Sequence, residues 1–159
     1  MEFEEAVELV SKKLDITKEE SEKIIEKAVI GGEVSEDGDF GSWCKDRFLP
    51  NCVLIDETGY SKMCVDALKI LSRTAPTDYG SSRQRDLGQL WADMTRGYLG
   101  EYAFLLFLKE RWGITAKLGH EIGKLQDYLP MDIHKIKDSN ADYRAPLIKI
   151  SVKTTKWNG

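Results

Sequence analysis

The chain has 159 residues, of which 42% are hydrophobic and 31% are charged, and its formal net charge is −4 at pH 7. This composition is typical of a soluble globular protein and excludes disordered and fibrous chains. No apolar run reaches the roughly 18 residues needed to span a bilayer, and the acidic start excludes a secretory signal. We therefore expect a cytoplasmic protein without a membrane partner.

The charges are distributed unevenly along the chain. Residues 1–40 contain 13 acids and 5 lysines, a net charge of −8, whereas residues 41–159 carry a net charge of +4. This asymmetry fits an acidic appendage beside a mildly basic body, and it fits equally an ordinary solvated helical surface at the N-terminus.

The chain has three cysteines, Cys44, Cys52 and Cys64, none in a C-x-x-C motif. A zinc site would need a fourth ligand, and His120 and His134 are the only histidines. We therefore expect reduced, partly buried thiols.

Two helices are predicted at the start of the chain. Apolar residues recur at helical spacing over residues 2–14, which indicates an amphipathic helix. The sequence T-K-E-E is a capping box with Thr17 as the cap and Glu20 reaching back, and it predicts a second helix that ends at Gly31-Gly32.

Loops and helices alternate in the middle of the chain. The turn-rich stretch 33–43 predicts a loop or a short hairpin, and residues 52–56 (CVLID) predict a short buried strand. Residues 61–71 predict a third helix. After a polar linker over 77–86, the longest helical tract begins, and its second part, residues 98–112, is apolar almost all round, as in a buried helix.

Three short β-rich segments follow Gly113. A helix followed by three strands indicates an α+β or α/β core. The strand segments are ITAKLG (114–119), MDIHKI (131–136) and PLIKISVKTT (146–155). The predicted organisation is a helical N-terminal region over residues 1–75, a linker and helix over 76–94, and a core over 95–159.

Two carboxylates and a lysine are candidates for a common site. Side chains alternate across a strand, so Ile148, Ile150 and Val152 are expected to face the core. If the last two strands are neighbours, Asp132 and Lys153 share the opposite, polar surface, which also carries the side chains of Lys149 and Ser151.

Glu101 lies among apolar residues of the predicted buried helix and requires a cation, a metal or a hydrogen-bond donor. Considered alone, Lys153 has the character of an ordinary solvent-exposed strand lysine, and Asp132 that of an acid at the edge of a strand. His134 is not expected to take part in the site. Together, two carboxylates and a lysine suit metal-assisted hydrolysis of a phosphodiester.

Three motifs in this order resemble the PD-(D/E)xK nuclease superfamily, to which restriction endonucleases and archaeal Holliday-junction resolvases belong. The motifs are G-x-x-G-E-x-A-F (97–104), P-M-D-I (130–133) and I-S-V-K-T-T-K (150–156). The resemblance covers residues 95–156. It implies a restriction-endonuclease-like α-β-β-β core, with the helix glutamate at Glu101, the sheet aspartate at Asp132 and the catalytic lysine at Lys153.

The function implied by the resemblance is Mg²⁺-dependent hydrolysis of DNA phosphodiester bonds, with Mn²⁺ as a substitute metal. Asp132 and Glu101 would hold the metal, Lys153 would position the nucleophile, and Ser151 would make a secondary contact. Double-stranded DNA is the expected partner, and a homodimer is one compatible assembly.

The sequence departs from the superfamily pattern at two positions. Met131 separates Pro130 from Asp132, and Ser151 stands where the third motif normally has an acid. The last helix and strand of the core would follow Gly159, so we expect a C-terminally truncated chain. The alternatives are a non-catalytic module that binds nucleic acid or protein, and a purely structural α+β domain.

Phosphate contacts are predicted at two places. Arg83 and Arg85 stand beside serines ahead of a helix, where an ordinary helix-start loop is an equally good explanation. Lys149, Lys153 and Lys156 would line a groove that follows the nucleic-acid backbone.

Overall fold

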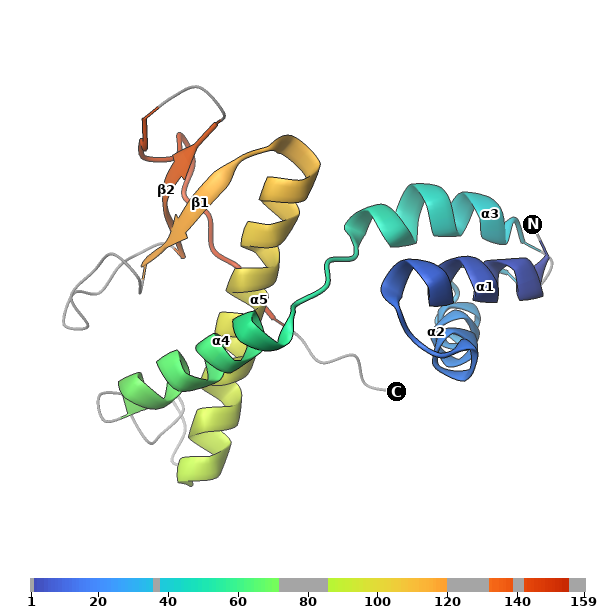
Figure 1. The fold of residues 1–159 in the computed structure, drawn as a ribbon, viewed down its shortest axis with the longest axis horizontal. Coiled ribbons are helices and arrows are strands. Elements are labelled where there is room, and N and C mark those ends of the chain that lie inside the picture. Colours follow the sequence, from blue (N-terminus) through green and yellow to red (C-terminus); the bar gives the residue numbers. More distant parts are fainter. Residues whose placement is uncertain (1, 36–37, 72–85, 120–131, 139–141, 155–159) are drawn as a thin grey trace. The chain divides into compact units, whose positions relative to one another are not determined.

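A computed structural model describes residues 2–35, 38–71, 86–119, 132–138 and 142–154 (Figure 1). The described helices and one small sheet make the fold α+β, as the sequence predicts. The chain divides into two compact units, one within residues 1–54 and the other within residues 55–156.

The first unit begins with the two predicted helices, α1 (Phe3–Leu14) and α2 (Lys18–Ile30). Asp15 ends α1 with a left-handed φ of 54°. The predicted capping box is present, because the Thr17 hydroxyl accepts from the Glu20 N–H at 3.2 Å and the Glu20 carboxylate accepts from the Thr17 N–H at 2.9 Å. Both helices are therefore fixed by local signals in the sequence.

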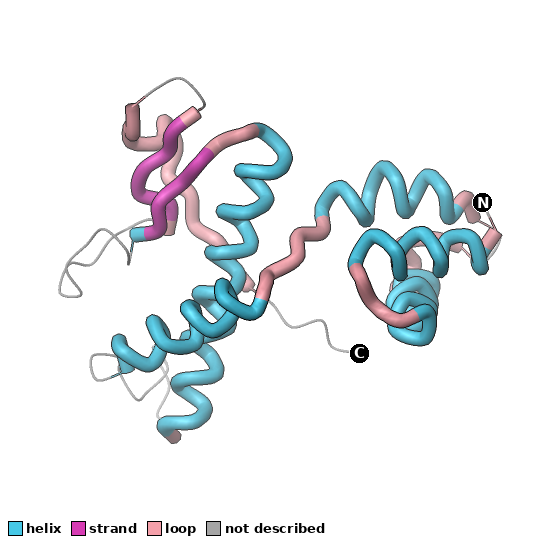
Figure 2. Tube along the Cα trace, in the orientation of Figure 1, coloured by secondary structure: helices cyan, strands magenta, loops and turns pink. Residues whose placement is uncertain are grey.

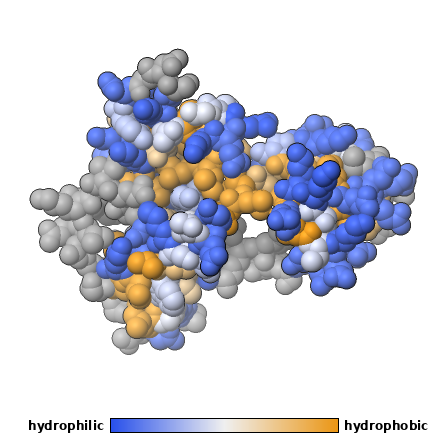
Figure 3. Space-filling model, viewed as in Figure 1, coloured by the Kyte–Doolittle hydropathy of each residue, from blue (hydrophilic) through white to orange (hydrophobic). Residues whose placement is uncertain are grey.

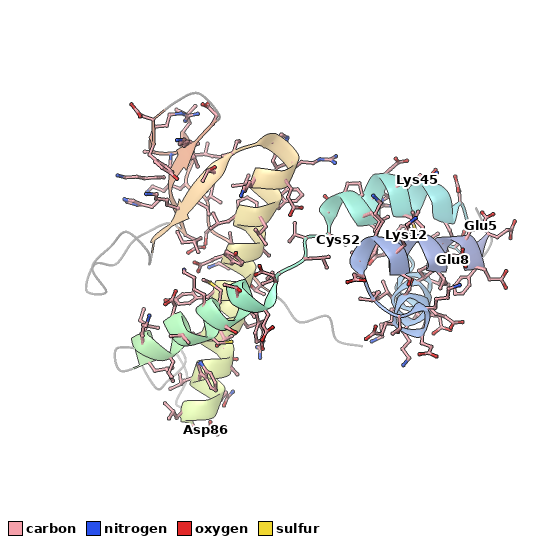
Figure 4. The ribbon with its side chains drawn as sticks, in the orientation of Figure 1. Glu5, Glu8, Lys12, Lys45, Cys52 and Asp86 are labelled. Carbon is pink, nitrogen blue, oxygen red and sulfur yellow. The ribbon has the colours of Figure 1, made fainter. Side chains whose placement is uncertain are left out.

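The core of the first unit lies between these helices and the segment that follows them. The buried Ser21 hydroxyl donates to the Val7 carbonyl at 2.8 Å and ties α2 to α1. Hydrophilic residues dominate the face of this unit that Figure 3 shows, and Glu5, Glu8 and Lys12 project from α1 (Figure 4). The buried apolar residues are Ala6, Val7, Val10, Ile25, Ala28, Val34, Phe40, Trp43 and Cys44.

The segment after α2 differs from its prediction. It is helical from Phe40 onward, through α3 (Phe40–Ser42), the π-helix η1 (Trp43–Phe48) and the 3₁₀-helix η2 (Leu49–Asn51). The predicted loop is wrong there because Phe40 and Trp43 bury their rings in the core and fix the backbone. The predicted strand over 52–56 is also wrong, since it has no strand partner among the described residues and Leu54 is 55% exposed.

The second unit contains the longer helices, α4 (Glu57–Ile70) and α5 (Leu87–Trp112). The Asp56 carboxylate caps α4 by accepting from the Gly59 N–H at 2.7 Å, so α4 begins four residues before its predicted start. Asp86, labelled at the beginning of α5 in Figure 4, caps that helix in the same way, accepting from the Gln89 N–H at 2.7 Å.

Helix α5 contributes to two hydrophobic clusters, which explains its nearly all-round apolar sequence. Tyr98 packs with Met63 and Ala67 of α4, and Leu108 packs against the sheet. Because α4 buries its apolar face against α5, it belongs to the second unit, and the division falls earlier in the chain than the predicted boundary at residue 75.

The sheet has two antiparallel strands, β1 (Thr115–Leu118) and β2 (Ile133–Lys137). Ala116 pairs with Ile136 and Leu118 with Ile133, so His134 is an extra residue in β2 and forms a β-bulge. The bulge lets Ile133 and Ile136, three residues apart, both face α5.

The predicted third strand is not a continuous strand over residues 142–154. Arg144 forms a bridge with Ile136 through hydrogen bonds of 2.8 and 2.9 Å, and the Asp132 N–H donates to the Ile150 carbonyl at 3.0 Å. The segment therefore runs beside β2 as a loop held by backbone hydrogen bonds at Arg144, Ile150 and Val152 (Figure 2). Ile150 packs on the core cluster as expected, whereas Ile148 is 72% exposed, contrary to its predicted core position.

The three cysteines are free thiols, as predicted: Cys44 is buried, and Cys52 and Cys64 are half-buried. Burial raises the pKa of the Cys44 and Cys52 thiols. Across the described ranges, no helix combines the length and apolar character required to cross a bilayer.

Candidate active site

A pocket of about 410 Å³ lies in the second unit, where α5, the start of β2 and the segment 152–154 meet. The three residues that the sequence singles out, Glu101, Asp132 and Lys153, all line it. They come from three separate segments of the chain, so only the fold brings them together. The other lining residues are Asp93, Met94, Arg96, Gly97, Tyr98, Val152 and Thr154.

Asp132 is held in place by three hydrogen bonds. Its N–H donates to the Ile150 carbonyl at 3.0 Å, its carbonyl accepts from the Gly119 N–H at 2.9 Å, and its Oδ2 accepts from the Val152 N–H at 2.5 Å. These bonds leave Oδ1 without a hydrogen bond from any described residue. The half-buried carboxylate therefore presents one fixed oxygen for a ligand or a metal.

Helix α5 contributes a stripe of residues four apart. Asp93, Gly97 and Glu101 lie one above another on the helix surface, and Asp93 forms an ion pair with Arg96 at 3.1 Å. Asp93 and Arg96 were not predicted from the sequence. Asp93 could have been identified by counting back two helical steps of four residues from Glu101.

A close approach between backbone segments positions Lys153. A Cβ atom on Gly100 would lie 3.0 Å from Thr154 Cβ and 3.2 Å from Thr154 Cγ2, and it would also clash with the Thr154 hydroxyl. The residue that follows Lys153 therefore packs directly on the α5 backbone, which is possible only because Gly100 has no side chain. At Gly97, one turn earlier, a Cβ would meet no atom within 4 Å.

Tyr98 is the titratable side chain of the pocket whose pKa is most changed. Its ring is only 7% exposed. Burial, followed by the negative charges of Glu101 and Asp66, raises the pKa of Tyr98 from 10.0 to about 12. The neutral phenol is therefore the stable form at neutral and moderately alkaline pH.

We expect alkaline pH to destabilise the second unit through Tyr98. The folded protein keeps the Tyr98 proton to a higher pH than the unfolded chain does. The contribution of the protonated phenol to the free energy of unfolding is therefore fully present below pH 10 and is lost as the pH rises toward 12. The shift corresponds to roughly 2–3 kcal/mol of unfolding free energy. Chemical denaturation of Tyr98→Phe and wild type across this range measures the effect, and identical alkaline losses in both would contradict it.

The other predicted site residues lie elsewhere. Ser151 and Lys149 are exposed and are not among the residues that line the pocket. His134 is half-buried at the bulge, and its Nδ1 has no hydrogen-bond partner among the described residues. Arg83, Arg85 and Lys156 lie outside the described residues.

The donor set has the chemistry that suits a hard divalent cation. Asp132 and Glu101 offer carboxylate oxygens, the ligands that Mg²⁺ prefers, and Mg²⁺ is usually held by one or two carboxylates while it keeps several waters. Within the described part of the chain, no group of three histidine, cysteine or acidic residues lies close enough to hold a metal by itself. A site built from these residues would therefore depend on water and substrate oxygens as well.

No protein-family model, curated protein or solved structure matches this chain. The fold and the pocket define a coarse class: an α+β protein with carboxylates and a lysine around one pocket. Its function is inferred from the chemistry of that pocket.

Proposed function

We propose that the protein is a Mg²⁺-dependent endonuclease of the PD-(D/E)xK type, which hydrolyses phosphodiester bonds of double-stranded DNA. The observation that carries the proposal is the convergence of Glu101, Asp132 and Lys153 on one pocket. The order of a helix, two antiparallel strands and a segment paired beside the second strand also supports it.

Asp132 and Glu101 would hold the metal, and Asp132 is the better ordered of the two ligands because its backbone and Oδ2 are both hydrogen-bonded. Mg²⁺ bound there would stabilise the negative charge that develops on the phosphate and would make a bound water more acidic. The Val152 N–H keeps Oδ2 pointing in one direction, so Oδ1 would be the oxygen available to a metal.

Lys153 would act on the water or on the phosphate. Its exposed side chain reaches the pocket from the segment held by Thr154, and its ammonium would either neutralise a non-bridging oxygen or, once deprotonated, accept a proton from the attacking water. The water oxygen bonds to phosphorus, the bond to the leaving oxygen breaks, and that oxygen takes up a proton. Ser151, exposed beside Lys153, would contribute only a secondary contact to the DNA.

The test combines cleavage with direct metal binding in carboxamide variants. Asp132→Asn keeps an oxygen for the Val152 N–H but removes the charge, and Glu101→Gln is the equivalent change on α5. We expect both variants to lose Mg²⁺-dependent plasmid cleavage by at least about 100-fold and to bind Mn²⁺ more weakly in a calorimetric titration, with unfolding unchanged. Wild-type cleavage by both variants would contradict the proposal.

One observation favours a second function, a non-catalytic module that binds nucleic acid or protein on a degenerate nuclease-like fold. Ser151 replaces the acid of the third motif, so the site has one carboxylate fewer than the superfamily pattern. Such a module would bind a partner but would neither cleave DNA nor bind Mn²⁺ at Asp132.

A further inference from the structure

A group of lysines covers the face of the sheet opposite α5. Cross-strand pairs alternate between faces, and the pairs Ala116–Ile136 and Leu118–Ile133 face α5. The pair between them, Lys117–Lys135, therefore faces outward, and so does Thr115–Lys137 at the end of the sheet. We call this surface the lysine face; it consists of Lys117, Lys135, Lys137 and Tyr143.

Tyr143 holds two of these lysines close together. The Lys117 ammonium lies 4.3 Å from the centre of the Tyr143 ring and the Lys137 ammonium 5.7 Å from it, so the two charges are no more than 10 Å apart. This separation does not exceed the Debye length of about 10 Å at 0.1 M salt, so their fields reinforce each other.

None of the described acids forms an ion pair with these lysines. The ion pairs in the described part of the chain involve other cations, and the acids that adjoin Lys137 and Tyr143 in sequence, Asp138 and Asp142, are exposed and join none of them. Lys117 and Lys135 are direct cross-strand partners, an arrangement of like charges that destabilises a sheet. A local arrangement that costs stability is typical of a functional surface.

We propose that the lysine face binds the phosphodiester backbone of nucleic acid. Closely spaced, unpaired ammonium groups complement a row of phosphates, and Tyr143, at 37% exposure, offers an aromatic edge beside them. Protein interfaces are depleted in lysine, and membrane-binding surfaces need several large apolar side chains, whereas the lysine face has Tyr143 alone. The binding does not require cleavage at the pocket and extends the DNA-contacting surface beyond it.

The test measures DNA binding in EDTA, which removes divalent metals and so prevents a metal-dependent nuclease from cleaving the probe. The probe is a short fluorescein-labelled DNA duplex, followed by anisotropy over a range of salt concentrations. For Lys117→Gln/Lys135→Gln we expect about tenfold or greater loss of affinity at low salt and a salt slope reduced by roughly 1 for each lysine. The matched control is Lys12→Gln/Lys13→Gln, which removes the same charge from the last turn of α1, where Figure 4 labels Lys12, and this variant should bind like wild type.

A single charge reversal separates lost binding from lost folding. Lys135→Glu creates an opposite-charge pair with Lys117, so its unfolding midpoint should equal or exceed that of wild type while DNA affinity falls at least as far as in the double variant. Wild-type affinity in either lysine-face variant, an equal loss in the α1 control, or binding to phosphatidylserine vesicles but not to DNA would overturn the proposal. Wild-type DNA binding in EDTA together with no cleavage when Mg²⁺ is added would instead reject the nuclease assignment alone.

Discussion

Replacing Gly100 with alanine is expected to push residues 152–154 off helix α5 and to remove Lys153 from the pocket. The added methyl group would clash with the Thr154 hydroxyl and would lie within 3.2 Å of Thr154 Cβ and Cγ2. Because threonine is β-branched, rotation about χ1 does little to relieve this clash. The segment moves because it is a loop held at few points, whereas α5 is a 26-residue helix. Cleavage should fall by about 100-fold or more, since small misplacements of catalytic groups have effects of this size.

The change in unfolding free energy is the difference between two opposing effects. Alanine is favoured over glycine inside a helix by about 0.5–1 kcal/mol. Displacement of Val152 breaks its hydrogen bond to the Asp132 carboxylate, and bonds to charged groups contribute about 1.5–3 kcal/mol. The net result is a loss of roughly 1–2 kcal/mol, accompanied by faster amide hydrogen exchange at Val152.

Gly97→Ala is the matched control for this stability measurement. It lies one turn earlier on the same helix, where the new methyl group meets no atom within 4 Å, so it should stabilise the protein by about 0.5–1 kcal/mol. The double variant Gly100→Ala/Thr154→Gly removes the clash and should restore slow exchange at Val152. The explanation fails if both alanine variants behave alike, or if the double variant does not recover.

Lys153→Met should abolish cleavage while metal binding persists. Methionine keeps most of the aliphatic stem and removes the ammonium, and loss of a general acid-base or charge-stabilising group lowers rates by about 10²–10⁴-fold. Mn²⁺ affinity should be unchanged, because the proposed ligands are Asp132 and Glu101. Single-turnover cleavage and a calorimetric Mn²⁺ titration on the same preparation give the two readouts.

Lys153→Arg distinguishes the two roles open to the ammonium group. Arginine keeps the charge but does not lose its proton, so it preserves activity if Lys153 neutralises phosphate and abolishes it if Lys153 accepts a proton. Lys109→Met, an exposed lysine in the last turn of α5, is the control for general loss of positive charge. Wild-type cleavage by Lys153→Met would remove Lys153 from the mechanism.

The helices could be predicted from the sequence because their signals are local. The capping box at Thr17 specifies the start of α2 within a few residues, and amphipathic spacing identifies α1. The π-helical segment after Phe40 could not be predicted in this way, because its turn-like residues are overridden by the burial of two aromatic rings. The third strand was predicted from β-rich composition, but composition does not reveal which backbone groups find partners across the sheet.

The pocket was predictable in part. Glu101 was identified because a carboxylate in an apolar helix needs a partner, and Asp132 and Lys153 were identified by order and spacing. Asp93 was missed because it lies in a polar part of α5, outside the motif. The lysine face was missed because the bulge at His134 changes the alternation of β2, and side-chain direction beyond a bulge does not follow from strand periodicity.

The position of α5 between two hydrophobic clusters has a consequence for cooperativity. Its first half completes the cluster with α4 and its second half completes the cluster with the sheet, so neither cluster survives if the helix melts. The second unit should therefore open in a single step rather than shed α4 or the sheet separately. Glu101 lies on α5 between the two clusters, and the middle of a helix is the last part to fray. Opening the backbone at Glu101 should therefore require as much free energy as unfolding the whole second unit.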